Sequence, residues 1–169
     1  MVALLQDGKP EASWIYIPTQ SICYFASLSG VEVAHQGTKY NFLEVKDKKT
    51  TFNNLNKLKF SASLRYLEPE IKVLIKDKLM HLKNQIFVGS AGIEATMFAK
   101  GQIDFIFHSI TTPWDHAPVD MFCRAIGGRT GQLRNFERSF SGFKAEKRAP
   151  ILFVRDVANW EMITDLITS

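Results

Sequence analysis

The sequence predicts an α/β fold with two unequal parts, and three observations indicate this. Short β-rich runs separated by turn residues occupy the N-terminal quarter, which is typical of an antiparallel meander. Farther along, apolar runs of strand length alternate with segments whose apolar residues recur at helical spacing, which indicates a layered α/β arrangement. A polar stretch from about 45 to 58 lies between them. The expected parts are 1–44, a partial antiparallel sheet, and 59–169, an α/β subdomain.

In the first part, the expected strands are 2–5, 13–17 and 22–27. Asp7-Gly8 is a dipeptide that favours a tight hairpin turn, and Pro18-Thr19 marks the next turn. Three strands alone would leave one face and one edge of the sheet bare. Such surfaces promote aggregation, so we expect a partner polypeptide, self-association into a homo-oligomer, or a truncated gene product.

In the second part, strands are expected at 60–64, 86–88, 103–107 and 151–154. A helix should follow Pro69, a suitable first-turn residue, and another should span 91–100 and stop at Gly101. A third helix should end at Gly127-Gly128, and a last helix closes the chain. Their apolar faces are formed by Ile71, Leu74, Ile75, Leu79 and Leu82 in the first helix, Val119, Phe122, Cys123 and Ile126 in the third, and Trp160, Ile163 and Ile167 in the last.

Composition indicates an ordinary cytoplasmic domain. The 169 residues are 46% hydrophobic and 22% charged, which suits one core, and no run approaches the roughly 18 apolar residues of a membrane span. Nor does the N-terminus read as a secretion signal. Cys23 and Cys123 are too few for a disulfide framework and are expected to be reduced. A net charge of +4 without a dense basic stripe excludes a nucleic-acid footprint.

The segment 114–118, Trp-Asp-His-Ala-Pro, carries the first chemical signal. Asp115 falls in the first turn of the expected helix, where the helix dipole and backbone N–H groups favour an anion and where a carboxylate can hold Mg²⁺. Magnesium sites for phosphoryl chemistry generally use several carboxylates, and no second one is recognisable. Trp114 is expected to pack beside the aspartate, and His116 to face solvent or cap the turn. Asp120 is expected to be a solvated helix acid, with a second metal ligand as the alternative.

A second signal is Gly89-Ser90-Ala91, at an expected strand-to-helix turn. Its backbone N–H groups can meet an oxyanion or a substrate hydroxyl, and Ser90 can equally be a plain helix N-cap. His108, at the end of a strand, can contact a substrate or can be a polar strand terminus. These residues are the candidate substrate contacts.

Taken together, Gly89-Ser90-Ala91, Trp114-Asp115-x-Ala117 and Ala125-x-Gly127-Gly128 resemble the C-terminal half of the inositol monophosphatase family of Mg²⁺-dependent, lithium-sensitive phosphatases. Asp115 follows Gly89 by 26 residues, close to the family spacing. The resemblance covers nearly the whole chain. It implies the C-terminal α/β half of a layered sandwich, with the N-terminal sheet only partly present.

The chain also departs from the family pattern. The Asp-Pro-x-Asp-Gly-Thr loop and the upstream Glu-Glu pair, which supply metal ligands, have no match. Val119 replaces the usual glycine, and His108 stands where the family tends to place a substrate-contacting glutamate, which argues against inositol.

The resemblance implies a Mg²⁺-dependent phosphomonoester hydrolase acting on a phosphorylated small molecule. Asp115 would hold a metal, and Gly89, Ser90, Ala91 and His108 would contact the alcohol portion. With most ligands absent, we expect weak or no Mg²⁺ binding and no activity from the chain alone. Two alternatives stay open: a non-catalytic remnant or binding module, and one half of a split phosphatase completed by a partner chain.

Overall fold

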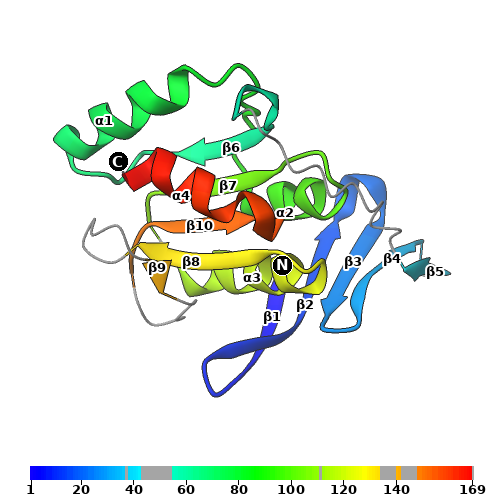
Figure 1. Ribbon diagram of the computed structural model, residues 1–169. Helices are drawn as coiled ribbons and strands as arrows, with labels where there is room; N and C mark the ends of the chain where they lie inside the picture. Colours follow the sequence, from blue (N-terminus) through cyan, green and yellow to red (C-terminus); the bar gives the residue numbers. More distant parts are fainter. Residues whose placement is uncertain (37, 43–54, 111, 134–139, 142–147, 169) are drawn as a thin grey trace.

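The N-terminal part is an antiparallel meander (Figure 1). The computed structural model describes residues 1–36, 38–42, 55–110, 112–133, 140–141 and 148–168. The first sheet contains β1 (Val2–Gln6), β2 (Lys9–Ile17), β3 (Ile22–Ser27), β4 (Gly30–His35) and β5 (Thr38–Phe42), paired in that order. Of these, β1 to β3 were expected, whereas β4 and β5 were not. Most of the predicted connecting loop at 45–58 lies outside the described residues.

The Asp7-Gly8 hairpin is confirmed. Gln6 pairs with Lys9 across the turn, and Asp7 and Gly8 have φ values of 50° and 74°. Two consecutive residues with positive φ give the turn whose twist matches the flanking strands.

The second sheet is mixed, with strand order β6-β7-β10-β8-β9. Only β6 and β7 pair in parallel. The strands are β6 (Phe60–Ser63), β7 (Phe105–His108), β8 (Arg129–Leu133), β9 (Phe140–Ser141) and β10 (Ile151–Val154). The helices are α1 (Pro69–Met80), α2 (Ala91–Ala99), α3 (Pro113–Ala125) and α4 (Trp160–Thr168), and short 3-10 turns lie at Pro18–Gln20, Leu55–Lys57 and Val157–Asn159.

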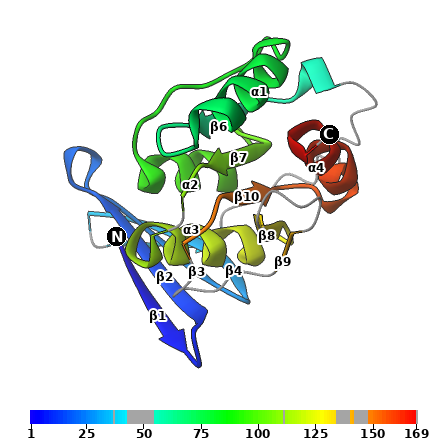
Figure 2. The ribbon, with the colours of Figure 1, turned by 90° about the vertical axis from the view of Figure 1, so that its left-hand side faces the viewer.

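These elements stack in layers (Figure 2). Helices α2 and α3 lie between the two sheets, while α1 and α4 cover the far face of the second sheet. Alternate residues of β10 therefore face two different cores: Phe153 packs into the core shared by both sheets, and Leu152 packs toward α1 and α4.

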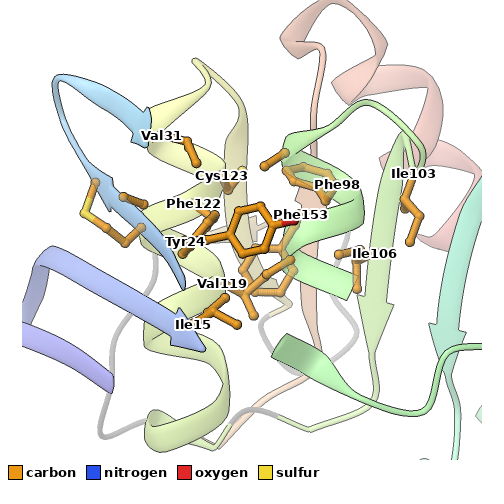
Figure 3. Close-up of a cluster of buried hydrophobic side chains, with 14 of the residues drawn as sticks. Ile15, Tyr24, Val31, Phe98, Ile103, Ile106, Val119, Phe122, Cys123 and Phe153 are labelled. Carbon is orange, nitrogen blue, oxygen red and sulfur yellow. The ribbon is translucent and has the colours of Figure 1, made fainter. Parts of the chain in front are cut away.

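The shared core joins the two parts of the chain (Figure 3). Ile15 and Tyr24 of the first sheet meet Val119 and Phe122 of α3. Val119 is fully buried there and contributes to packing. The sheet's opposite face carries exposed or half-buried apolar side chains from β1 to β3, and no described element covers it: Val2, Leu4, Trp14, Tyr16, Cys23 and Phe25.

The expected strand at 86–88 is wrong. Gln85 forms only a single bridge to Phe60, and the segment continues as irregular chain to α2. Phe87 is 84% exposed, while Ile86 and Val88 pack against the shared core. Ile86 and Val88 therefore anchor this segment to the core, although the segment lacks the ladder of hydrogen bonds that defines a strand.

Candidate functional site

Both sequence motifs open onto one cavity. It has a volume of about 430 Å³ and lies where α2 begins, β7 ends and α3 begins. Its walls are formed by Ser63, Tyr66, Gly89, Ser90, Ala91, Glu94, His108, Ser109, Ile110, Thr112, Asp115, His116 and Arg148. All five candidate site residues named from the sequence are among them.

The Gly89-Ser90-Ala91 turn forms the start of α2. Gly89 has a φ of 72°, a conformation that favours glycine, and Ser90 is the N-cap. The Ser90 hydroxyl accepts a hydrogen bond of 3.5 Å from the amide of Ile93. Ser90 therefore caps the helix and lines the cavity at the same time.

Asp115 lies in the first turn of α3, and Thr112 occupies the N-cap position. The Thr112 hydroxyl donates a hydrogen bond of 2.8 Å to Oδ2 of Asp115. Asp115 is half-buried on the cavity wall. Trp114 does not pack beside it as expected: its side chain is 64% exposed, because at this position of the first turn it points away from the core.

His108 ends β7 and is buried, with both ring nitrogens within hydrogen-bond distance of other side chains. Its Nε2 lies 2.7 Å from Oε2 of Glu94, and its Nδ1 lies 2.7 Å from Nε2 of His116. A ligand in the cavity can therefore meet the edge of the His108 ring, but its nitrogens are already engaged.

The expectation that His116 faces solvent is wrong, but the alternative that it caps the turn is confirmed: its Nδ1 accepts a hydrogen bond of 2.8 Å from the backbone N–H of Thr112, the N-cap residue. His116 is 5% exposed, because the first turn of α3 directs it inward against the end of β7. Burial lowers the pKa of His116 to about 4, so its ring is neutral near pH 7.

Glu94 was missed in the sequence. It lies on α2, one turn after Ser90, and is buried. The Ser61 hydroxyl donates a hydrogen bond of 2.6 Å to its Oε1. Burial alone would raise the pKa of Glu94, but the bonds from His108 and Ser61 outweigh it and lower that pKa, so the carboxyl is ionised. The available signal was an acidic residue within the otherwise apolar helix 91–99.

The expectation that Asp120 is a solvated acid is also wrong. Asp120 is 3% exposed, and burial raises the pKa of its carboxyl to about 6. Asp120 lies in the protein interior and is not among the residues that line the cavity.

The described residues do not by themselves fit the metal centre that the sequence motifs imply. Among them, no group of three or more His, Cys, Asp or Glu side chains is placed to hold a cation. The cavity has two carboxylates; both oxygens of Glu94 accept bonds from protein groups, which leaves Asp115 as one candidate ligand. A single carboxylate is too little for Mg²⁺ at an all-protein site.

No helix in the described part of the chain has the length and apolar character needed to span a membrane.

Comparison with known proteins identifies relatives. The model of the inositol monophosphatase family matches residues 1–144. Sequence comparison with curated proteins gives no match.

Among solved structures, similar folds include inositol monophosphatases from Anabaena (Nostoc) and from Zymomonas mobilis. Both have TM-scores of 0.74, with sequence identities of 17% and 14%, respectively. Each match covers 98% of this chain, but only 61% of the Anabaena protein and 60% of the Zymomonas protein. An IMPase/NADP phosphatase solved with Mg²⁺ and phosphate has a TM-score of 0.72 at 19% identity, covering 97% of this chain and 56% of its own. At such identities the likeness establishes the fold. The chain spans about three-fifths of the length of these relatives.

Proposed function

The chain belongs to the inositol monophosphatase family, and from this membership we propose that its cavity is the alcohol-binding half of a phosphomonoester hydrolase site. The observation that carries the proposal is the meeting of the two family motifs. Gly89-Ser90-Ala91 and Asp115 are 26 residues apart in sequence and line the same cavity of about 430 Å³. That volume suits a small phosphorylated molecule.

Each wall residue has a distinct role in this proposal. The backbone at Ser90 and Ala91 begins α2, where N–H groups can meet an anionic or hydroxyl oxygen. His108 contributes the edge of its ring, since its nitrogens are engaged. Asp115 is the candidate metal ligand, and Mg²⁺ is the metal that the family implies. Arg148, whose side chain is exposed at the cavity, can attract an anionic substrate.

The remaining carboxylates must come from outside the described residues. We therefore propose that the chain alone binds Mg²⁺ weakly or not at all and does not turn over substrate, and that a family N-terminal half with the missing carboxylates completes the site. A cytoplasmic location is part of the same proposal. The alternative function is a non-catalytic binding module, which the lack of a cation-binding cluster in the described residues favours.

Complementation tests the proposal. The chain is assayed alone and as a fusion behind a family N-terminal half that carries the Glu-Glu and Asp-Pro-x-Asp-Gly-Thr elements, with a panel of phosphomonoesters and saturating Mg²⁺. We expect no hydrolysis from the chain alone and weak Mg²⁺-dependent hydrolysis from the fusion, lost in Asp115→Asn. Asp165→Asn, at an exposed site on α4, is the matched control and should keep the activity. A folded fusion that binds Mg²⁺ but hydrolyses no phosphomonoester would contradict the enzyme proposal and favour the binding module. Hydrolysis that is unchanged by Asp115→Asn would do the same.

A further inference from the structure

A continuous line of hydrogen bonds runs along the wall of the cavity from β6 to the start of α3. We call it the histidine network: Ser61, Glu94, His108, His116 and Thr112. Its contacts measure 2.6 Å from Ser61 to Glu94, 2.7 Å from Glu94 to His108, 2.7 Å from His108 to His116, and 2.8 Å from His116 to the Thr112 amide. Of these residues, all but Thr112 are buried.

The two ends of the network fix the direction of every bond between them. At one end, the backbone N–H of Thr112 can only donate, so Nδ1 of His116 accepts. A neutral His116 then carries its proton on Nε2 and donates to Nδ1 of His108. His108 in turn carries its proton on Nε2 and donates to the Glu94 carboxylate, which can only accept. Reading from Glu94 toward Thr112 gives the same assignment.

The opposite direction would require an additional proton. His108 would be cationic, and His116 would carry its proton on Nδ1 and donate it to the Thr112 carbonyl, 3.0 Å away. That carbonyl already accepts from the amides of Asp115 and His116. The Thr112 N–H would also point at a protonated nitrogen. The geometry therefore favours two neutral rings.

We propose that Glu94 is the positioning residue of the cavity: by accepting the Nε2 proton of His108 it holds the two rings in the tautomers that the Thr112 amide also requires, and through them it keeps the first turn of α3 in register with α2. Ser61 supports Glu94 from β6. The last member, Thr112, donates through its hydroxyl to Asp115, so the network ends at the carboxylate that lines the cavity.

This role has a consequence for the ligand. All four ring nitrogens of His108 and His116 are committed to protein partners. The wall they form presents no free imidazole donor or acceptor, so ligand recognition is left to the turn at Ser90 and Ala91, to Asp115, and to the remaining polar side chains of the lining.

Nitrogen-15 NMR of the histidine rings in the full chain tests the proposal directly, without substrate or metal. The chain has four histidines, and the signals of His35 and His81 are assigned by substitution to Gln. At pH 7.5 we expect both His108 and His116 to show a protonated Nε2 and an unprotonated Nδ1. A protonated Nδ1 on His116, or a cationic His108, overturns the proposal in the unmodified protein, so the result does not depend on any variant folding.

Two substitutions separate positioning from simple packing. Glu94→Gln should keep both tautomers, because its amide oxygen can accept from His108 while its NH₂ group donates to Ser61. Glu94→Leu removes the acceptor and leaves the buried Nε2 proton of His108 unpaired, so we expect a shifted His108 Nε2 signal together with shifted amide signals at Thr112 and Asp115. Unchanged His108, Thr112 and Asp115 signals in a folded Glu94→Leu variant would show that Glu94 does not position the start of α3.

Asp120→Asn and Asp120→Leu are the matched controls. They change another buried carboxyl, on α3, that forms none of the network's hydrogen bonds, and they should leave the histidine signals as in the unmodified protein. Shifts as large as those of Glu94→Leu would count against a specific role for Glu94. Because every measurement is made on the resting protein, a failed complementation assay would leave this result standing.

Discussion

Nε2 of His108 lies 2.7 Å from Oε2 of Glu94, which joins the end of β7 to the middle of α2. The contact buries an ionised carboxyl next to a cavity, and the surrounding hydrogen bonds stabilise the charge. Removing one of those bonds should therefore cost more than removing an ordinary buried hydroxyl.

Ser61→Ala tests that expectation. The Ser61 hydroxyl donates to Glu94, so its loss should lower the free energy of unfolding by about 1–3 kcal/mol. Because the folded-state pKa of Glu94 is lowered, its carboxylate adds stability above its unfolded pKa and loses it as the pH falls through the folded value. The cost should therefore be largest at neutral pH in urea unfolding.

Ser13→Ala is the control for this experiment. Ser13 is equally buried, but its hydroxyl has no hydrogen-bond partner in the described structure. Its replacement should be neutral or stabilising. Equal losses from both serines would contradict the importance of the Ser61–Glu94 bond.

Asp120→Asn should stabilise the protein at high pH. Its carboxyl has a folded pKa of about 6, above the ordinary value of 3.8, so stability falls as the pH rises from about 4 to 6. Above that range the charged form costs about 2–3 kcal/mol, which the amide avoids. Urea unfolding should show this gain at pH 8 and little gain at pH 4. Asp165→Asn, at an exposed position, should change neither value by more than about 0.5 kcal/mol.

The two glycines after α3 should respond differently to alanine. At Gly128 a Cβ would lie 2.7 Å from the Val154 carbonyl and 2.8 Å from Sγ of Cys123, so Gly128→Ala should cost about 3 kcal/mol through overpacking. Gly127 has open space but a φ of 77°, so Gly127→Ala should cost about 1 kcal/mol of backbone strain. Thermal and urea unfolding check the order; a larger loss at Gly127 would refute the packing argument.

The bare face of the first sheet should promote self-association. Trp14 and Tyr16 expose aromatic surface there, and Trp14 packs with Phe25 at a centroid distance of 5.2 Å. We expect concentration-dependent light scattering from the chain, reduced in the double variant Trp14→Thr and Tyr16→Thr. Val73→Thr, on the exposed side of α1, is the control and should not reduce it. A stable monomer at high concentration would rule the surface out as an association site.

Local sequence patterns were sufficient for much of the fold. Asp7-Gly8 predicted its hairpin because only a few residues tolerate two consecutive positive φ values. Pro69 marked the start of α1 because its fixed φ and missing N–H suit the first helical turn. Ser90 marked the start of α2 because its hydroxyl can accept from a free backbone N–H there. The 86–88 run failed because a strand also needs a paired neighbour, which composition does not specify.

The sequence by itself determined the candidate residues of the site and the family to which they belong: Gly89, Ser90, Ala91, His108 and Asp115 all line the cavity. Only the tertiary structure decided the state of the buried polar groups. The sequence of α3 does not show which of its polar residues are buried and which are exposed. Packing of α3 between two sheets buries both His116 and Asp120. Glu94 acquires its partners from β6 and β7, up to 33 residues away, because hydrogen bonds and desolvation depend on distances between elements rather than on spacing along the chain.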